Sequence, residues 1–139
     1  MPVSVKEVRT RSELRAYIHL PDKIHASHKG WVPPIYADEW EFYNPSKNRF
    51  FQDCSTILML AEKDGQIAGR IMGIINHKYN SAHQETSGRF FAFECYNDPE
   101  IALALLTAVE NWLKPQGMTK IIGPFGFSDK DPQGFLIEG

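Results

Sequence analysis

The segment from Gly88 to Gly123 constrains the fold more than any other part of the chain. It contains an apolar stretch over 88–96, a short polar junction, an amphipathic stretch over 99–114 and a second apolar stretch over 119–123. Asp98 is a favourable helix N-cap, Pro99 suits the first helical position, and Gly117 follows the end. The pattern predicts a strand, a helix and a strand, with Trp112 buried. A helix that joins two strands of one sheet makes them parallel.

A β-hairpin is predicted directly before this unit. Asp64-Gly65 separates the apolar runs Thr56–Lys63 and Gln66–Asn76, and both residues of such a turn take positive φ. Alternation places Ile67, Gly69 and Gly73 on one face of the returning strand. The glycines allow close approach of either a helix or a ligand, and the sequence leaves both open.

The remaining elements are less regular. We expect a short strand over 3–8, and a helix that begins near Ser12 and breaks or kinks at Pro21. A polar connection is expected over 77–87. The aromatic-rich, proline-punctuated stretch over 30–53 should pack as short helical turns over one edge of the core.

Composition narrows the class of protein. The chain has 139 residues, a net charge of −2 and 42% hydrophobic residues, which predicts one domain over 1–139 and gives no electrostatic reason to expect nucleic acid. It shows neither the apolar core of a signal peptide nor a run long enough to span a membrane. Cys54 and Cys95 lie far apart without a CxxC spacing. We therefore expect a cytoplasmic protein without a membrane partner.

The order of these elements resembles the GNAT superfamily of acyl-CoA N-acyltransferases. The likeness is carried by AEKDGQIAGRIMGI (61–74) and IALALLTAVENWLKPQGMTKI (101–121). The resemblance implies an α/β (α+β) fold with a mixed, mostly antiparallel central sheet and helices packed on it. It also implies acyl transfer from acetyl-CoA to a small amine.

In that family the strand before the helix splays from the strand after it, and the cofactor lies in the gap. By this resemblance the pantetheine arm would lie against Phe93, Glu94 and Cys95, and the diphosphate near 97–102. The implied cofactor-binding residues are Phe93, Cys95, Tyr96, Asn97, Asp98, Glu100, Ile101 and Ala102.

The diphosphate loop departs from the family pattern Arg/Gln-x-x-Gly-x-Gly/Ala. Over 97–102 the chain reads NDPEIA, and only Ala102 matches. Pro99 has no N–H to donate, and the carboxylates of Asp98 and Glu100 would repel a diphosphate. The two acids also stabilise a helix N-terminus without any ligand. We therefore expect acetyl-CoA to bind weakly.

Glu94 is the predicted catalytic residue, because a carboxylate among Phe90, Phe91 and Phe93 could serve as general base. The alternative is a structural glutamate paired with Arg70 or Arg89. His25 and His28 have helical i, i+3 spacing but no acidic or thiolate partner at ligand spacing. We expect them to be surface histidines and expect no metal site.

Two functions stay open: an N-acyltransferase, and a GNAT-like binding or oligomerisation module without catalysis. The GNAT core continues beyond its second splayed strand, whereas this chain ends at Gly139. We therefore expect the N-terminal portion of a longer fold, or a homo-oligomer that covers the exposed strand edge.

Overall fold

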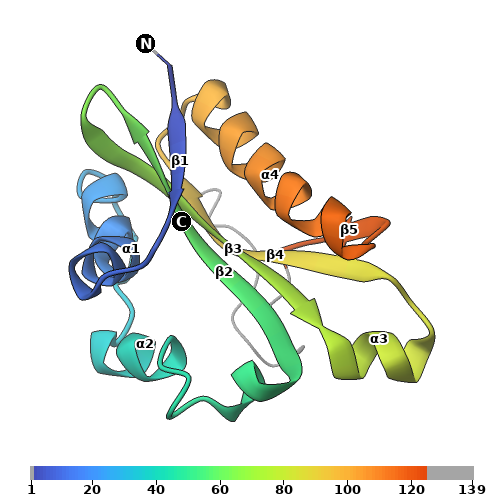
Figure 1. Ribbon diagram of the computed structural model, residues 1–139. Coiled ribbons are helices and arrows are strands. Elements are labelled where there is room, and N and C mark those ends of the chain that lie inside the picture. The colour runs from blue at the N-terminus through green and yellow to red at the C-terminus, as the bar shows by residue number, and fades with distance from the viewer. Residues whose placement is uncertain (1, 125–139) are drawn as a thin grey trace.

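The computed structural model describes residues 2–124 and shows a mixed α/β fold built on a five-stranded sheet (Figure 1). The strands are β1 (Ser4–Glu7), β2 (Cys54–Lys63), β3 (Gln66–Asn76), β4 (Ser87–Cys95) and β5 (Lys120–Ile122). The α-helices are α1 (Arg11–Ile24), α2 (Tyr36–Phe42), α3 (His77–His83) and α4 (Pro99–Leu113), with short 3-10 turns η1 (Arg49–Asp53) and η2 (Lys114–Gln116).

The sheet is mostly antiparallel, as expected. Its order is β1-β2-β3-β4-β5, and the parallel pair is β4 with β5. The hairpin between β2 and β3 turns at Asp64 (φ 55°) and Gly65 (φ 78°), which confirms the predicted turn chemistry. The predicted strand–helix–strand unit is likewise present as β4, α4 and β5.

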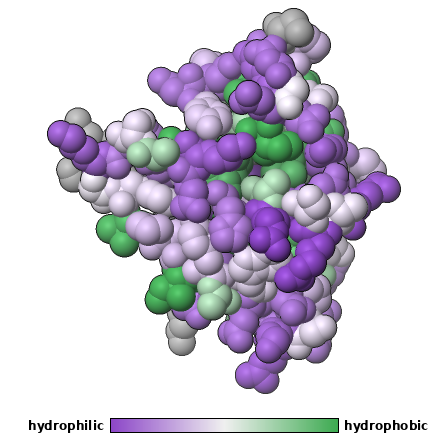
Figure 2. Space-filling model, turned by 90° about the vertical axis from the view of Figure 1, so that its left-hand side faces the viewer, coloured by the Kyte–Doolittle hydropathy of each residue, from purple (hydrophilic) through white to green (hydrophobic). Residues whose placement is uncertain are grey.

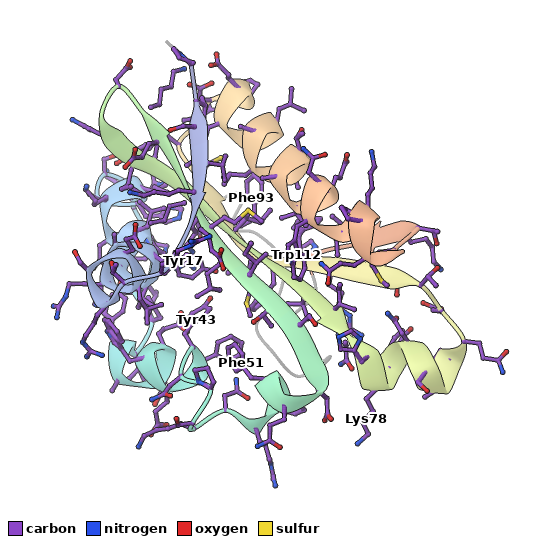
Figure 3. All side chains as sticks on the ribbon, in the orientation of Figure 1. Tyr17, Tyr43, Phe51, Lys78, Phe93 and Trp112 are labelled. Carbon is purple, nitrogen blue, oxygen red and sulfur yellow. The ribbon has the colours of Figure 1, made fainter. Side chains whose placement is uncertain are left out.

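Helices cover both faces of the sheet. Figure 3 shows Phe93 and Trp112 on the side of α4, and Tyr17, Tyr43 and Phe51 on the side of α1 and α2. The glycines of β3 serve helix packing. A Cβ at Gly69 would lie 2.8 Å from Leu105 Cδ1, and a Cβ at Gly73 would lie 3.0 Å from the Trp112 ring. Trp112 is half-buried rather than buried, and its neighbour Leu113 takes the fully buried place.

The local structure differs from the expectations at three places. Of the break or kink expected at Pro21, the break is wrong, because helix α1 runs through Pro21 to Ile24. The polar connection after β3 contains α3, whose first turn is capped by the Asn76 side chain accepting from Tyr79 N at 2.9 Å. An extra residue in β3 near Ala68 shifts the register against β2, so Ile67 packs on the α1 side of the sheet, with the cluster that contains Tyr17 and Ile18, and not on the face of Gly69.

The aromatic-rich segment packs as predicted, as the short helices α2 and η1 with Trp40, Phe42 and Phe51 against the α1 side of the sheet. Figure 2 views the molecule from this side and shows a mostly hydrophilic surface with separate apolar areas. Within residues 2–124, the structure contains no helix that is both long and apolar enough to cross a bilayer.

Candidate functional site

A β-bulge in β4 lies at the centre of the candidate site. Arg70 pairs with Glu94 and Met72 pairs with Phe91, so Ala92 and Phe93 together oppose Ile71. Ala92 has a φ of 55°, in the left-handed region that disfavours a side chain. The sequence carried no signal for this bulge, because nothing in it marks Ala92 as conformationally special. Bulges re-aim the side chains that follow them, and here Glu94 follows.

Arg70 holds this bulge to α1. Its guanidinium is buried, with 6% of the residue exposed, and Nε donates to Ala92 O at 3.0 Å. Nη1 donates to Tyr17 O at 2.8 Å and to Ile18 O at 3.3 Å. Pro21 has no N–H for the carbonyl four residues earlier, which is that of Tyr17. Arg70 supplies the missing donor, so α1 continues through its proline.

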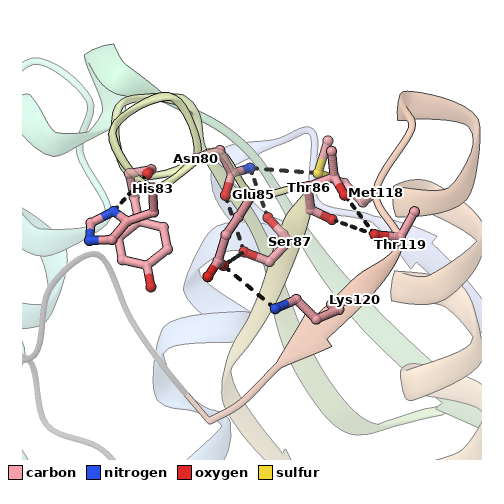
Figure 4. A network of polar contacts seen from close by, with 9 residues as sticks. Asn80, His83, Glu85, Thr86, Ser87, Met118, Thr119 and Lys120 are labelled. Atoms are coloured by element: carbon pink, nitrogen blue, oxygen red, sulfur yellow. Dashed lines mark hydrogen bonds and ion pairs between the residues drawn. The ribbon is translucent and has the colours of Figure 1, made fainter.

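Strands β4 and β5 are held together at one end. Their pairing covers Ser87–Arg89 with Lys120–Ile122. Figure 4 shows the polar network at this end, in which Ser87 Oγ and Asn80 Oδ1 are 3.1 Å apart and the hydroxyls of Thr86 and Thr119 are 2.6 Å apart. Strand β4 continues to Cys95 beyond the last residue that pairs with β5. The bulge and Glu94 lie in this continuation.

Glu94 belongs to a chain of three ionisable side chains. Its Oε2 lies 2.9 Å from His25 Nε2, and His25 Nδ1 lies 2.9 Å from His28 Nδ1. The Trp31 ring stacks on His25 at 5.2 Å between centroids. The exposed side-chain fraction is 29% for Glu94 and 13% for His25, while His28 is exposed.

The expected partner of Glu94 and the expected surface exposure of His25 therefore both differ from the structure. Arg70 is opposite Glu94 across the strands, but Nε and Nη1 of Arg70 donate to backbone carbonyls, and the 2.9 Å partner of Glu94 is His25. His25 is not a surface histidine, although His28 is. The i, i+3 spacing was the available signal, but its meaning depends on how α1 packs on β4. Among the described residues, no group of His, Cys, Asp or Glu is arranged to hold a metal ion.

Residues 97–102 form a helix start that is already capped. Asp98 Oδ1 accepts from Glu100 N at 3.0 Å, and Asp98 O accepts from Ile101 N at 3.1 Å and Ala102 N at 3.2 Å. Because Pro99 has no N–H, the first-turn donors over 99–102 are all absent or engaged by Asp98.

Lys63, which the sequence did not single out, lies against these acids at the end of β2. Its Nζ is 2.5 Å from Asp98 Oδ2 and 3.9 Å from Glu100 Oε2. The hydrogen bond from Lys63 lowers the pKa of Asp98, and the same bond raises the pKa of Lys63. Part of the negative charge expected at the loop is therefore neutralised.

The other predicted cofactor residues lie along the end of β4 and just after it. Phe93 and Cys95 are half-buried, and Tyr96 is 40% exposed. Cys95 is a free thiol, like Cys54, and burial raises its pKa, so it is a poor nucleophile. The structure thus brings Phe93–Tyr96 next to Asn97–Ala102 in one continuous segment.

Two curated proteins are similar to the chain over nearly all its length. Protein YghO of Escherichia coli (strain K12) is 32% identical over 135 residues, which are 97% of this chain and 34% of that protein. A bacterial ceramide synthase of Caulobacter vibrioides is 32% identical over 141 residues, 99% of this chain and 36% of that protein. The chain therefore spans about a third of the length of these relatives. No protein-family model matches it.

Solved acetyltransferases share the fold at low sequence identity. AAC(6')-Iy in complex with the bisubstrate analog CoA-S-monomethyl-acetylneamine is 16% identical, with a TM-score of 0.60 over 95% of this chain and 82% of that one. PaiA N-acetyltransferase of Thermoplasma acidophilum in complex with coenzyme A is 18% identical, with a TM-score of 0.55 over 85% and 76%. An aminoglycoside acetyltransferase from an uncultured soil metagenomic sample, in complex with sisomicin, is 14% identical, with a TM-score of 0.58 over 86% and 75%. The chain therefore has the GNAT-like fold of the acyl-CoA N-acyltransferases.

Proposed function

We propose that this chain carries the donor site and the base of an N-acyltransferase that moves an acyl group from acyl-CoA to an amine. The observation that carries the proposal is the bulge at Ala92, with Glu94 next to it and joined to His25, where β4 extends beyond its pairing with β5. A pantetheine arm can pair with strand backbone at such an edge, as an added strand would.

The chemistry requires a base at this place. An amine bound as its ammonium ion must lose a proton before its nitrogen lone pair can attack the thioester carbon. The C–N bond then forms, the C–S bond breaks, and the thiolate leaves as the CoA thiol by taking up the second proton that the amine nitrogen loses. One proton is released per turnover, and Glu94 with its joined histidines is the group proposed to take it.

The donor is proposed to lie along Phe93, Glu94 and Cys95, with its diphosphate near Asn97–Ala102. Asp98 occupies the first-turn amides that would otherwise bind phosphate oxygens. We therefore propose weak binding of acetyl-CoA, with Lys63 as the available positive charge beside the loop.

The acceptor is proposed to be a small amine. The neighbours named above include an aminoglycoside acetyltransferase in complex with sisomicin. The name of the Caulobacter relative describes the same class of bond, because a ceramide is an amide of a fatty acid and a long-chain amine. Long-chain acyl groups and amines therefore belong among the substrates to test.

A second candidate is a GNAT-like module that binds without catalysis. The observation that favours it is the same cap, since Asp98 satisfies the amides of α4 without any ligand.

A coupled assay of free thiol release distinguishes the two candidates. The chain is incubated with acetyl-CoA or palmitoyl-CoA and a panel of primary amines that includes an aminoglycoside and a long-chain amino alcohol. We expect amine-dependent thiol release that falls about 100-fold or more in Glu94→Gln. The control Glu110→Gln, on the exposed side of α4, should match the unsubstituted chain. Absence of amine-dependent release with every pair would favour the binding module.

A further inference from the structure

We infer that His28 is the proton acceptor of this site and that Glu94 acts on it through His25. The inference rests on the proposed acyl transfer for its catalytic meaning. Its structural content, a chain of hydrogen bonds that fixes which ring nitrogen carries each proton, can be tested separately. It differs from the expectation that Glu94 alone is the base.

The carboxylate of Glu94 determines the tautomers of both histidines. An ionised carboxylate only accepts hydrogen bonds, so the 2.9 Å contact with Oε2 requires a proton on His25 Nε2. A neutral imidazole then has its lone pair on Nδ1. The 2.9 Å contact between the two Nδ1 atoms in turn requires a proton on His28 Nδ1. The lone pair of neutral His28 is therefore on Nε2.

The basic nitrogen of the three-residue chain is therefore Nε2 of His28, which is an exposed residue and the member of the chain that does not contact Glu94. His28 Nε2 can take a proton from a bound ammonium group. At the same time the Nδ1 proton of His28 passes to Nδ1 of His25. His28 remains neutral with its proton on Nε2, and the positive charge appears on His25, whose Nε2–H still donates to Glu94. The step needs no further reactant. The site is reset when the proton on His25 Nδ1 returns to His28 Nδ1 while His28 Nε2–H gives its proton to solvent, which restores the starting tautomers of both rings.

The surroundings of His25 suit a charge that appears only during the reaction. His25 is largely covered, with 13% of its side chain exposed, so an unpaired imidazolium there would be unfavourable. Glu94 supplies the counter-charge at 2.9 Å from β4, and the Trp31 ring covers the imidazole face. Among the described residues, Arg70 on β3 and the neighbouring thiol of Cys95 also interact electrostatically with Glu94.

Glu94 and His25 are accordingly positioning residues, and His28 is the catalytic residue that would touch the substrate. Glu94 and His25 form a carboxylate–histidine pair, in which the carboxylate fixes the tautomer of the imidazole and stabilises the imidazolium. His28 is a second histidine, whose tautomer is fixed by its hydrogen bond to His25. The loop after α1 brings His28 into line because His28 N donates to His25 O at 2.9 Å.

Long-range ¹H–¹⁵N NMR of the histidine rings tests the tautomers without any assay of activity. At a pH where the rings are neutral, we expect the proton of His25 on Nε2 and that of His28 on Nδ1. In Glu94→Gln the amide can donate as well as accept, so the preference of His28 for Nδ1–H should be lost. His83 is the matched control, because its Nδ1 lies 3.0 Å from Tyr79 O and should stay protonated in both proteins. A proton on His28 Nε2 in the unsubstituted chain would overturn the inference.

Kinetics test the catalytic part. In the thiol-release assay, His28→Gln should lower kcat about 100-fold while leaving KM for acyl-CoA within about twofold, and His83→Gln should leave both unchanged. Full activity of His28→Gln would overturn the role of His28 as acceptor. If the unsubstituted chain transfers no acyl group while the tautomers are as expected, the proposed function fails, the catalytic role fails with it, and the hydrogen-bonded chain stands.

Discussion

At the scale of single residues, Arg70 connects the parts of the site that come from different elements. It binds the carbonyl of the bulge residue Ala92 and the carbonyl that Pro21 leaves without a donor. From the sequence we expected a break or a kink at Pro21, and Arg70 as a possible partner of Glu94. Neither expectation included the contact between them, in which Arg70 donates to the Tyr17 carbonyl that Pro21 leaves without a donor.

A double-mutant cycle tests this relation. Arg70→Met leaves buried carbonyls without a donor and should lower the free energy of unfolding by about 2–4 kcal/mol. Pro21→Ala restores the N–H that can bond Tyr17 O. Arg70→Met should therefore be milder in that background by about 1 kcal/mol in urea unfolding. Exposed Arg49 offers the control, since Arg49→Met should change stability by less than about 0.5 kcal/mol. Strict additivity would contradict the account.

A second prediction at the scale of residues concerns the acidic side chains of the diphosphate loop and the affinity for CoA. Glu100→Gln removes a negative charge from the first turn of α4 and leaves the Asp98 cap in place, so calorimetry should detect tighter binding of CoA. We expect a gain of about threefold to tenfold at low salt, shrinking as salt increases. Glu110→Gln removes a charge from the exposed side of the same helix's last turns and should have no such effect. Equal gains in the two variants would mean that net charge, not the loop, limits affinity.

At the scale of elements, the close packing of α4 on β3 depends on glycine. A Cβ at Gly69 would lie 2.8 Å from Leu105 Cδ1, 3.0 Å from Cys95 Cβ and 3.0 Å from Ile101 Cγ2. Gly69→Ala should therefore destabilise the chain by about 1–3 kcal/mol in urea unfolding. Leu105→Ala removes the nearest atom, so Gly69→Ala should be less destabilising in that background. An unchanged penalty would show that Leu105 does not limit the approach.

The start of α1 makes a prediction about pH. The N–H groups of Arg9 and Thr10 donate to Glu13 Oε1 at 2.9 and 3.0 Å and lower the pKa of Glu13. The folded state therefore favours the ionised carboxylate. Its contribution is full above the ordinary pKa of 4.5 and is lost as pH falls through the lowered folded value.

The unsubstituted chain should accordingly exceed Glu13→Gln in urea midpoint near neutral pH, and the difference should shrink as pH falls below the ordinary pKa. Glu110→Gln, away from the cap, should show no comparable dependence. A difference that stays constant down to low pH would refute this role of the Glu13 charge.

Elements were more predictable than the site because they follow from local patterns. Asp64-Gly65 and the Asp98-Pro99 start of α4 are short-range signals, and both lie where expected. The bulge at Ala92 and the Glu94–His25 contact depend on which elements pack together, so local patterns do not contain them. Helix α3 was missed because it is short, with only 7 residues, and because most of its residues are polar. It ends at Gln84, which has a left-handed backbone conformation.

At the scale of the whole molecule, the chain spans about a third of its curated relatives. We propose that it supplies the donor side of the site and the base, and that a longer chain or a second copy extends the acceptor side. The sequence also contains an apolar run, Phe135-Leu136-Ile137, which we expect to belong to an interface, and which lies outside the described residues. Light scattering measures the molar mass of the purified chain and so tests whether a second copy associates with it. We predict a dimer, and a stable monomer at high concentration would contradict the proposal of a second copy.

The proposed donor site lies where β4 continues beyond its pairing with β5. The most direct measurement is a ¹H–¹⁵N NMR titration of the chain with CoA. The account predicts that backbone amides of Phe93–Tyr96, beside the bulge, shift in fast exchange as expected for weak binding, and that the amides of Asp98–Ala102 shift less because Asp98 holds them. Shifts confined to other surfaces, or none at millimolar CoA, would contradict it.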